Sequence, residues 1–149
     1  MYEDDLPEID ALVPALRAFL GPAFAHVQAV ATETRYQLAR VAIRHGDAST
    51  ARREVAALAK IDVPFIRAFV RLIHAAAHVL DVKVVAAREA LVGAIADAEI
   101  SQMTTLAALA RRRVAQLDGE DVADADAVLA KRGLVDPVRF ARMFATWPE

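Results

Sequence analysis

The sequence predicts an all-α fold, a compact bundle of about six helices. Apolar residues recur at alternating steps of three and four along most of the 149 residues, which is the spacing of helices that bury one face. The sequence lacks runs of alternating β-branched residues bounded by turns, which would predict strands. Alanine, the strongest helix former, supplies 34 residues. We expect one helical domain over residues 1–149, because this length buries an adequate core.

Glycine and capping residues divide the N-terminal part into three predicted helices. The first covers about residues 7–20 and ends at Gly21. The second ends at Gly46, because glycine suits the left-handed residue after a helix, and Asp47 caps the third helix, which runs to about Lys60. The short connection predicts that the second and third helices are antiparallel neighbours.

The middle of the sequence predicts one long central helix over about residues 64–98. Pro64 suits its first turn, and neither proline nor glycine follows before Gly93. The three-four spacing continues through the whole span, with a bend near Asp81 as the alternative. At 1.5 Å per residue such a helix is roughly 50 Å long. Its ends would extend past its shorter neighbours and need cover from elsewhere.

The C-terminal part predicts three shorter helices. The first begins near Ser101 and ends at Asp118. The second covers about residues 120–132, with acids in its first turns and bases in its last, as the helix dipole favours. Asp136 caps a short final helix within residues 134–149, which also include a tail.

Two nine-residue stretches resemble each other, TARREVAAL at 50–58 and VAAREALVG at 85–93, at a separation of 35 residues. A period near 34 residues is typical of arrays of helical hairpins. Alanine-rich helices resemble one another without common origin, and the large residues expected of such arrays are absent. We interpret the similarity as coincidence.

Composition and charge exclude several classes of function. The sequence has no cysteine, which excludes disulfides, thiolate zinc sites and cysteine nucleophiles. Its N-terminus is acidic, unlike a signal peptide, and no run of 18 apolar residues occurs, so we expect a cytoplasmic protein without membrane contact. The net charge is -2, although residues 11–117 carry 14 bases against 8 acids. This balance is far from that of a protein dedicated to nucleic acid.

The segment HAAAH contains two histidines four residues apart. His74, His78 and Asp81 follow at i, i+4 and i+7, so a continuous helix points all three the same way, in a geometry able to bind zinc. Arg67, Arg71 and Arg88 share this face and oppose a cation, and the general-base glutamate of HExxH is missing. We favour a polar flank in which Asp81 pairs with a basic residue. A metal or ligand site is the alternative, and we expect no cofactor.

Residues 54–72, EVAALAKIDVPFIRAFVRL, have the pattern of two helices joined by a tight corner. The expected buried positions are Val55, Ala56, Leu58, Ala59, Ile61, Ile66, Phe69 and Val70. This segment resembles the helix-turn-helix of bacterial regulators such as the LacI and MerR families. The resemblance implies DNA binding by Arg67 and Arg71, exposed on the second helix. Lys60 replaces the usual glycine of the turn, and Phe65 replaces a polar residue that would face the groove.

Two features near the C-terminus have structural and functional interpretations. Phe140, Met143, Phe144 and Trp147 are spaced three and four apart, as in an apolar stripe that packs on the core or, alternatively, binds a partner. Residues 111–113 are three consecutive arginines. Because these spread over roughly 200° of a helix, we interpret them as part of a solvated face.

The sequence contains no recognisable catalytic constellation, such as a glycine-rich phosphate loop, a GxSxG elbow or paired Glu-x-x-His motifs. We therefore predict a non-enzymatic helical adaptor or assembly module. Its partner is another protein or a second copy of itself, in a homo-oligomer. A helix-turn-helix regulator is the second hypothesis, and a ligand or metal binder at His74 and His78 is the third.

Overall fold

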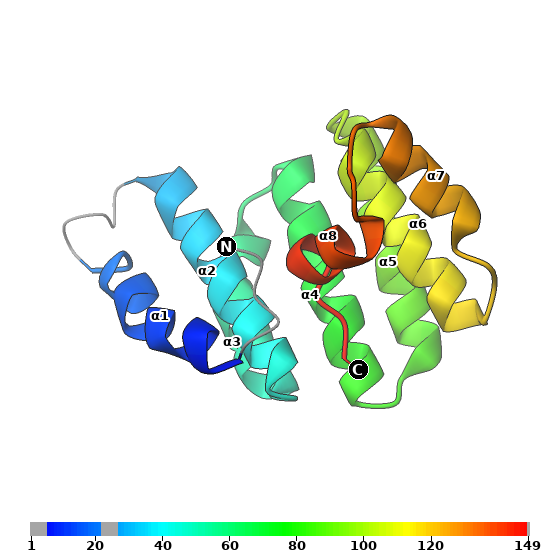
Figure 1. Ribbon diagram of the computed structural model, residues 1–149. Coiled ribbons are helices and arrows are strands. Elements are labelled where there is room, and N and C mark those ends of the chain that lie inside the picture. Colours follow the sequence, from blue (N-terminus) through cyan, green and yellow to red (C-terminus); the bar gives the residue numbers. More distant parts are fainter. Residues whose placement is uncertain (1–5, 22–26, 149) are drawn as a thin grey trace.

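The computed structural model describes residues 6–21 and 27–148 (Figure 1). Within these residues the chain forms eight α-helices, one 3-10 turn and no strand, which confirms the all-α prediction. In chain order they are α1 (Leu6–Ala18), α2 (Gln28–Arg44), α3 (Ala48–Ala56), η1 (Leu58–Lys60), α4 (Pro64–Leu80), α5 (Val84–Ile100), α6 (Thr104–Asp118), α7 (Ala123–Lys131) and α8 (Pro137–Phe144).

Two hydrophobic clusters share α4 between them. One lies among α2, α3 and α4, around Tyr36 and Ile43, and the other lies among α4, α5, α6, α7 and α8, around Leu91 and Leu109. One face of α4 contributes residues to the first cluster and another face to the second, and Phe69 packs against both. Figure 1 shows α1 to α3 on one side of α4 and α5 to α7 on the other, with α8 lying across the middle. The predicted central position of this region is therefore correct.

The predicted single helix over residues 64–98 is wrong, because the chain reverses between α4 and α5. Val82 adopts a left-handed conformation with φ of 60°. The N–H of Lys83 then donates to the carbonyl of His78 at 2.8 Å, which closes the end of α4. Glycine usually occupies the left-handed position of this turn. Since valine stands there, the sequence has no conspicuous break, although the alternative of a bend near Asp81 gave the right place.

The same three-residue turn recurs along the chain. Gly46 between α2 and α3 and Gln102 between α5 and α6 also have positive φ, 73° and 57°. In both turns the N–H of the following residue donates to the carbonyl five residues earlier, at 2.9 Å for Asp47 and 2.8 Å for Met103. Each turn joins two antiparallel helices directly and satisfies carbonyl groups at the end of the first one.

The α2–α3 and α4–α5 hairpins begin 36 residues apart, at Gln28 and Pro64, and α2 and α4 each have 17 residues. Their turns follow with the same offset, at Gly46 and Val82. The similarity noted between residues 50–58 and 85–93 has an offset of 35 residues, so its matched arginines do not occupy equivalent positions. The repetition therefore lies in the architecture of the hairpins and not in those nine residues.

Small residues bring α4 and α5 close together. Ala68 and Ala75 of α4 and Ala87, Ala94 and Ala98 of α5 are all buried at or near zero exposure. A seam of small side chains allows two helices to approach closely. In the described residues, no helix combines the length and the hydrophobicity needed to cross a bilayer.

Candidate interaction surface

The helix α5 is apolar on two opposite faces. Its inner face contributes Ala87, Leu91, Ala94 and Ala98 to the core. On the other side Val85, Val92 and Ile100 are 74%, 49% and 68% exposed. A helix on the surface of a globular protein normally has a polar outer face, whereas α5 exposes apolar side chains that the described part of the chain does not cover.

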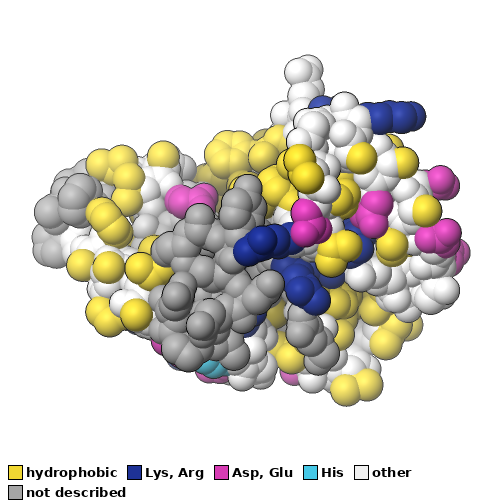
Figure 2. All heavy atoms as spheres, in the orientation of Figure 1, with side chains coloured by type: hydrophobic (Ala, Val, Ile, Leu, Met, Phe, Trp, Pro, Cys, Tyr) yellow, Lys and Arg dark blue, Asp and Glu magenta, His cyan; other side chains and the backbone are white. Residues whose placement is uncertain are grey.

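We define the α5 outer face as Val85, Val92, Ala96 and Ile100, all of which are exposed. At 100° per residue these four positions lie within an arc of about 80°, and at 1.5 Å per residue they extend over about 22 Å. The exposed Val82 in the preceding turn continues the apolar surface at one end. The turn from α4 to α5 lies at the lower edge of the molecule in Figure 1, and Figure 2 shows hydrophobic side chains there.

Ion pairs between α5 and α6 border the outer face on one side. The Arg88 guanidinium lies 3.0 Å from Asp118 near the start of α5, and Glu99 pairs with Arg111 near its end. Arg88, Glu99 and Arg111 are half exposed, so each retains contact with solvent. An apolar strip with a charged, solvated border is the usual arrangement of a protein–protein interface.

A buried carboxylate, Asp97, borders the other side. Arg67 Nη2 lies 3.0 Å from Asp97 Oδ1, and Arg71 Nε lies 2.8 Å from Oδ2 without the alignment of a hydrogen bond. The hydrogen bond to Asp97 raises the pKa of Arg67. Arg71 crosses α5 at Gly93, where an added Cβ would stand 2.2 Å from Arg71 Nη1. These interactions join α4 to α5.

The structure thus places the two arginines proposed for DNA binding in the α4–α5 interface. Of the positions expected to be buried in the helix-turn-helix pattern, Val55, Leu58, Ile66 and Val70 are buried, whereas Ala56 and Ala59 are exposed. The second helix of that pattern is α4, which lies between the two cores and not at a free edge. The burial of a tight helical corner produces the same pattern of apolar residues.

Among the described residues, Asp81 pairs with Arg52 rather than with His74 or His78. The carboxylate of Asp81 accepts a hydrogen bond from Arg52 at 2.6 Å, and Arg52 also donates to the Ala77 carbonyl at 3.1 Å. This hydrogen bond lowers the pKa of Asp81. Across the described ranges, no group of three or more His, Asp or Glu side chains is placed to hold a metal. Asp81 is therefore the partner of a basic residue, the arrangement favoured from the sequence.

The surroundings of both histidines disfavour the protonated form. Burial is the main cause that lowers the pKa of His74, and its neighbours His78, Arg52 and Arg71 add to this effect. Burial also lowers the pKa of His78, helped by Arg52 and Lys83. The Nδ1 atom of His78 is buried without a hydrogen-bond partner. These two side chains thus serve as a weakly polar flank of α4.

The C-terminal aromatic stripe packs against the cores. Phe140, Phe144 and Trp147 are partly buried there, and the Phe140 and Phe144 rings lie 4.6 Å apart. The Tyr36 hydroxyl donates to the carbonyl of Phe144, which ties α8 to α2. The side chain of Met143, the fourth predicted member, lies outside the described part of the structure. Where the structure describes the stripe, it is therefore core packing and leaves little free surface for a partner.

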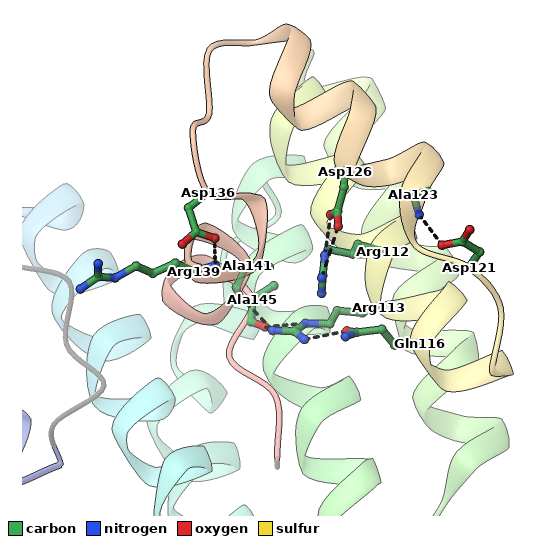
Figure 3. Close-up of polar contacts among 10 residues, drawn as sticks. All are labelled: Arg112, Arg113, Gln116, Asp121, Ala123, Asp126, Asp136, Arg139, Ala141 and Ala145. Atoms are coloured by element: carbon green, nitrogen blue, oxygen red, sulfur yellow. Dashed lines mark hydrogen bonds and ion pairs between the residues drawn. The ribbon is translucent and has the colours of Figure 1, made fainter.

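Two of the three consecutive arginines are buried, which corrects their interpretation as a solvated face. Arg112 and Arg113 are each 4% exposed, and only Arg111 is exposed. Figure 3 shows Arg113 directed at the end of α8, where it donates to the carbonyls of Ala145 at 2.6 and 2.9 Å and of Ala141 at 3.1 Å. The carbonyl of Ala141 also accepts the backbone N–H of Ala145 at 2.9 Å, whereas that of Ala145 lies just past the last turn of α8. A cation suits this negative end of a helix.

Arg112 has a carboxylate partner, because its Nε donates to Asp126 of α7 at 2.7 Å (Figure 3). The buried arginines thus hold α7 and α8 against α6. Arg113 also lies over the Trp147 ring, 5.5 Å from its centroid. The sequence shows no signal for the capping of α8, since the acceptors are backbone carbonyls.

Comparisons of this chain with protein-family models, with curated proteins and with solved structures found no match.

Proposed function

We propose that the protein is a non-enzymatic assembly module that binds another protein chain through the α5 outer face. The observation that supports this proposal is the exposed apolar strip of α5, with charged residues along both sides. Contiguous exposed apolar surface marks interaction sites more often than isolated exposed residues do. The face is straight and about 22 Å long, which suits an α-helix as the contacting element of the partner.

The available free energy fits a reversible interaction. Full burial of a valine or isoleucine contributes about 1.5–3 kcal/mol, so Val85, Val92 and Ile100, already partly covered, would contribute on the order of 4 kcal/mol together. Association costs a comparable amount in lost translational and rotational freedom. Binding therefore also depends on contacts made by the partner and by the charged border.

Photo-crosslinking in the cells that naturally produce the protein tests this proposal. A photo-reactive amino acid is introduced in place of Val85 or Ile100, and, as the control, in place of Val135, which is fully exposed but lies in the turn before α8. We expect covalent adducts with a protein chain from the two α5 positions and none from the control. The additional substitution Val92→Asp should abolish the adducts. Equal adduct formation at all three positions, or none on α5, would contradict the proposal.

A further inference from the structure

We propose that the chain bound by the α5 outer face is a second copy of this protein, with the two α5 helices antiparallel across a twofold axis. This inference rests on the proposed function and identifies its partner. A twofold contact places the same surface on both sides, so the face must complement itself. Its apolar residues and its charges can each be examined for that property.

The apolar residues match in the antiparallel direction. Val85 precedes Val92 by seven residues and Ile100 follows it by eight. A twofold axis that passes between residues 92 and 93 therefore sets Val85 of one copy against Ile100 of the other, at both ends of the contact. The two most exposed side chains of the face then cover each other, and the two Val92 side chains meet near the axis.

On the side of the face toward α6, the charges match in the same direction. Arg88 and Glu99 are eleven residues apart, so they project from α5 in directions that differ by only about 20°. They therefore border the same side of the face, one near each end of the helix. In an antiparallel pair the same flanks of both helices meet, which brings Arg88 of each copy beside Glu99 of the other. In a parallel pair this flank would instead meet the opposite flank of the other helix, which carries neither Arg88 nor Glu99.

The existing ion pairs can extend into a four-membered network. Arg88 already pairs with Asp118 and Glu99 with Arg111, and all four side chains lie on the α5–α6 side of the face. Across the axis their signs alternate in space, as favourable networks of partly exposed charges require. Each new contact occurs twice because of the symmetry.

One charged residue lies within the apolar strip and must be accommodated. Glu89 is exposed, and at 100° per residue it projects in a direction between those of Ala96 and Ile100. In the antiparallel alignment it lies opposite Ala96 of the other copy. The small alanine side chain leaves room for the Glu89 carboxylate to reach solvent at the edge of the contact.

Single-cysteine variants test the geometry, because the natural sequence has no cysteine. Under mild oxidation we expect Val92→Cys to form a disulfide-linked dimer. Val85→Cys and Ile100→Cys should form few dimers alone and a mixed dimer when combined. A Val135→Cys variant serves as the control for random collision. Efficient linkage of Val85→Cys to itself, or linkage no faster than in the control, would overturn the antiparallel arrangement.

Charge reversal tests the recognition, with sedimentation velocity as the readout. The wild-type chain should be dimeric at micromolar to near-millimolar concentration. Arg88→Glu or Glu99→Arg alone should weaken dimerisation about tenfold or more, because two attractions become two repulsions. An equimolar mixture of both variants should recover a mixed dimer, since each contact is then between opposite charges. Circular dichroism verifies that each variant folds.

The outcomes separate this inference from the proposed function. A wild-type chain that is monomeric at every concentration overturns self-association. If adducts from Val85 in cells then contain a different protein, the assembly function stands with another partner. If α5 gives neither dimers nor adducts, both proposals fail.

Discussion

Replacement of Val82 by glycine should stabilise the protein, although it removes a side chain from the folded structure. Val82 has a φ of 60°, a conformation that costs an L-residue roughly 1–2 kcal/mol and suits glycine. The side chain is 83% exposed, so little packing is lost. Glycine also increases the entropy of the unfolded chain, which offsets about 0.5–1 kcal/mol of the gain. The expected net effect of Val82→Gly is a stabilisation of about 0.5–1 kcal/mol.

Urea unfolding followed by far-ultraviolet circular dichroism measures this difference. For a chain of this size, about 1 kcal/mol corresponds to a rise in Tm of roughly 2–4 °C. Val82→Ala is the matched control, because it removes the branched side chain while leaving a Cβ in the left-handed conformation. We expect it to recover much less of the stabilisation than glycine does.

The reverse substitution at the equivalent turn completes the test. Gly46 has a φ of 73°, and nothing lies within 4 Å of a Cβ placed there. Gly46→Val should therefore destabilise the protein by about 0.5–1 kcal/mol, because the lower entropy of the unfolded chain offsets part of the backbone strain of about 1–2 kcal/mol. The reasoning is refuted if Val82→Gly lowers the free energy of unfolding, or if Gly46→Val leaves it unchanged.

Further substitutions test the interactions that hold the helices together. Asp97→Asn should reduce the free energy of unfolding in urea by about 1–3 kcal/mol, because two arginines lose their carboxylate, whereas Asp62→Asn at an exposed ion pair should change it by less than about 0.5 kcal/mol. Arg113→Met should release the C-terminal segment before global unfolding, seen as a shift in the fluorescence of the single tryptophan; a coincident transition by circular dichroism would argue against this. Because the pKa values of His74 and His78 are lower in the folded chain, their contribution to stability is complete above about pH 6.5 and is lost as the pH falls below that value. Replacing both histidines by glutamine should flatten the dependence of the urea midpoint between about pH 7.5 and 5.5, and an unchanged slope would assign it to other groups.

Local signals predicted those helix ends at which residue type and backbone conformation agree. Asp47 caps α3 through its hydrogen bond to Thr50, and Asp136 caps α8 through its bond to Arg139. Gly119 and Gly133 follow α6 and α7 with positive φ, as expected. The prediction is wrong at Val82, which adopts the left-handed conformation although valine does not favour it. Tertiary packing of the two alanine-rich helices outweighs the local cost of that turn.

The prediction of one helix over residues 64–98 also explains why the α5 outer face was not predicted. On one continuous helix, the apolar side chains within residues 84–100 would all belong to a single seam. With the reversal after Leu80, α5 packs against both α4 and α6, and its remaining apolar residues become a separate outer face. The burial of Arg112 and Arg113 was missed for a related reason. Arginine as a residue type predicts exposure to solvent, and the groups that accept their hydrogen bonds lie later in the chain, at Asp126 and Ala145.

The distribution of residue sizes on α5 bears on its function. Three of the residues in its inner seam are alanines, whereas Val85, Val92 and Ile100 are exposed on the outside. A helix whose only contacts were within its own chain would gain stability by burying its large apolar residues and exposing its small ones. The small inner residues permit close packing against α4, and the large outer residues have no comparable use within the monomer. The contact that we propose at the outer face would bury those side chains on association and so account for their size.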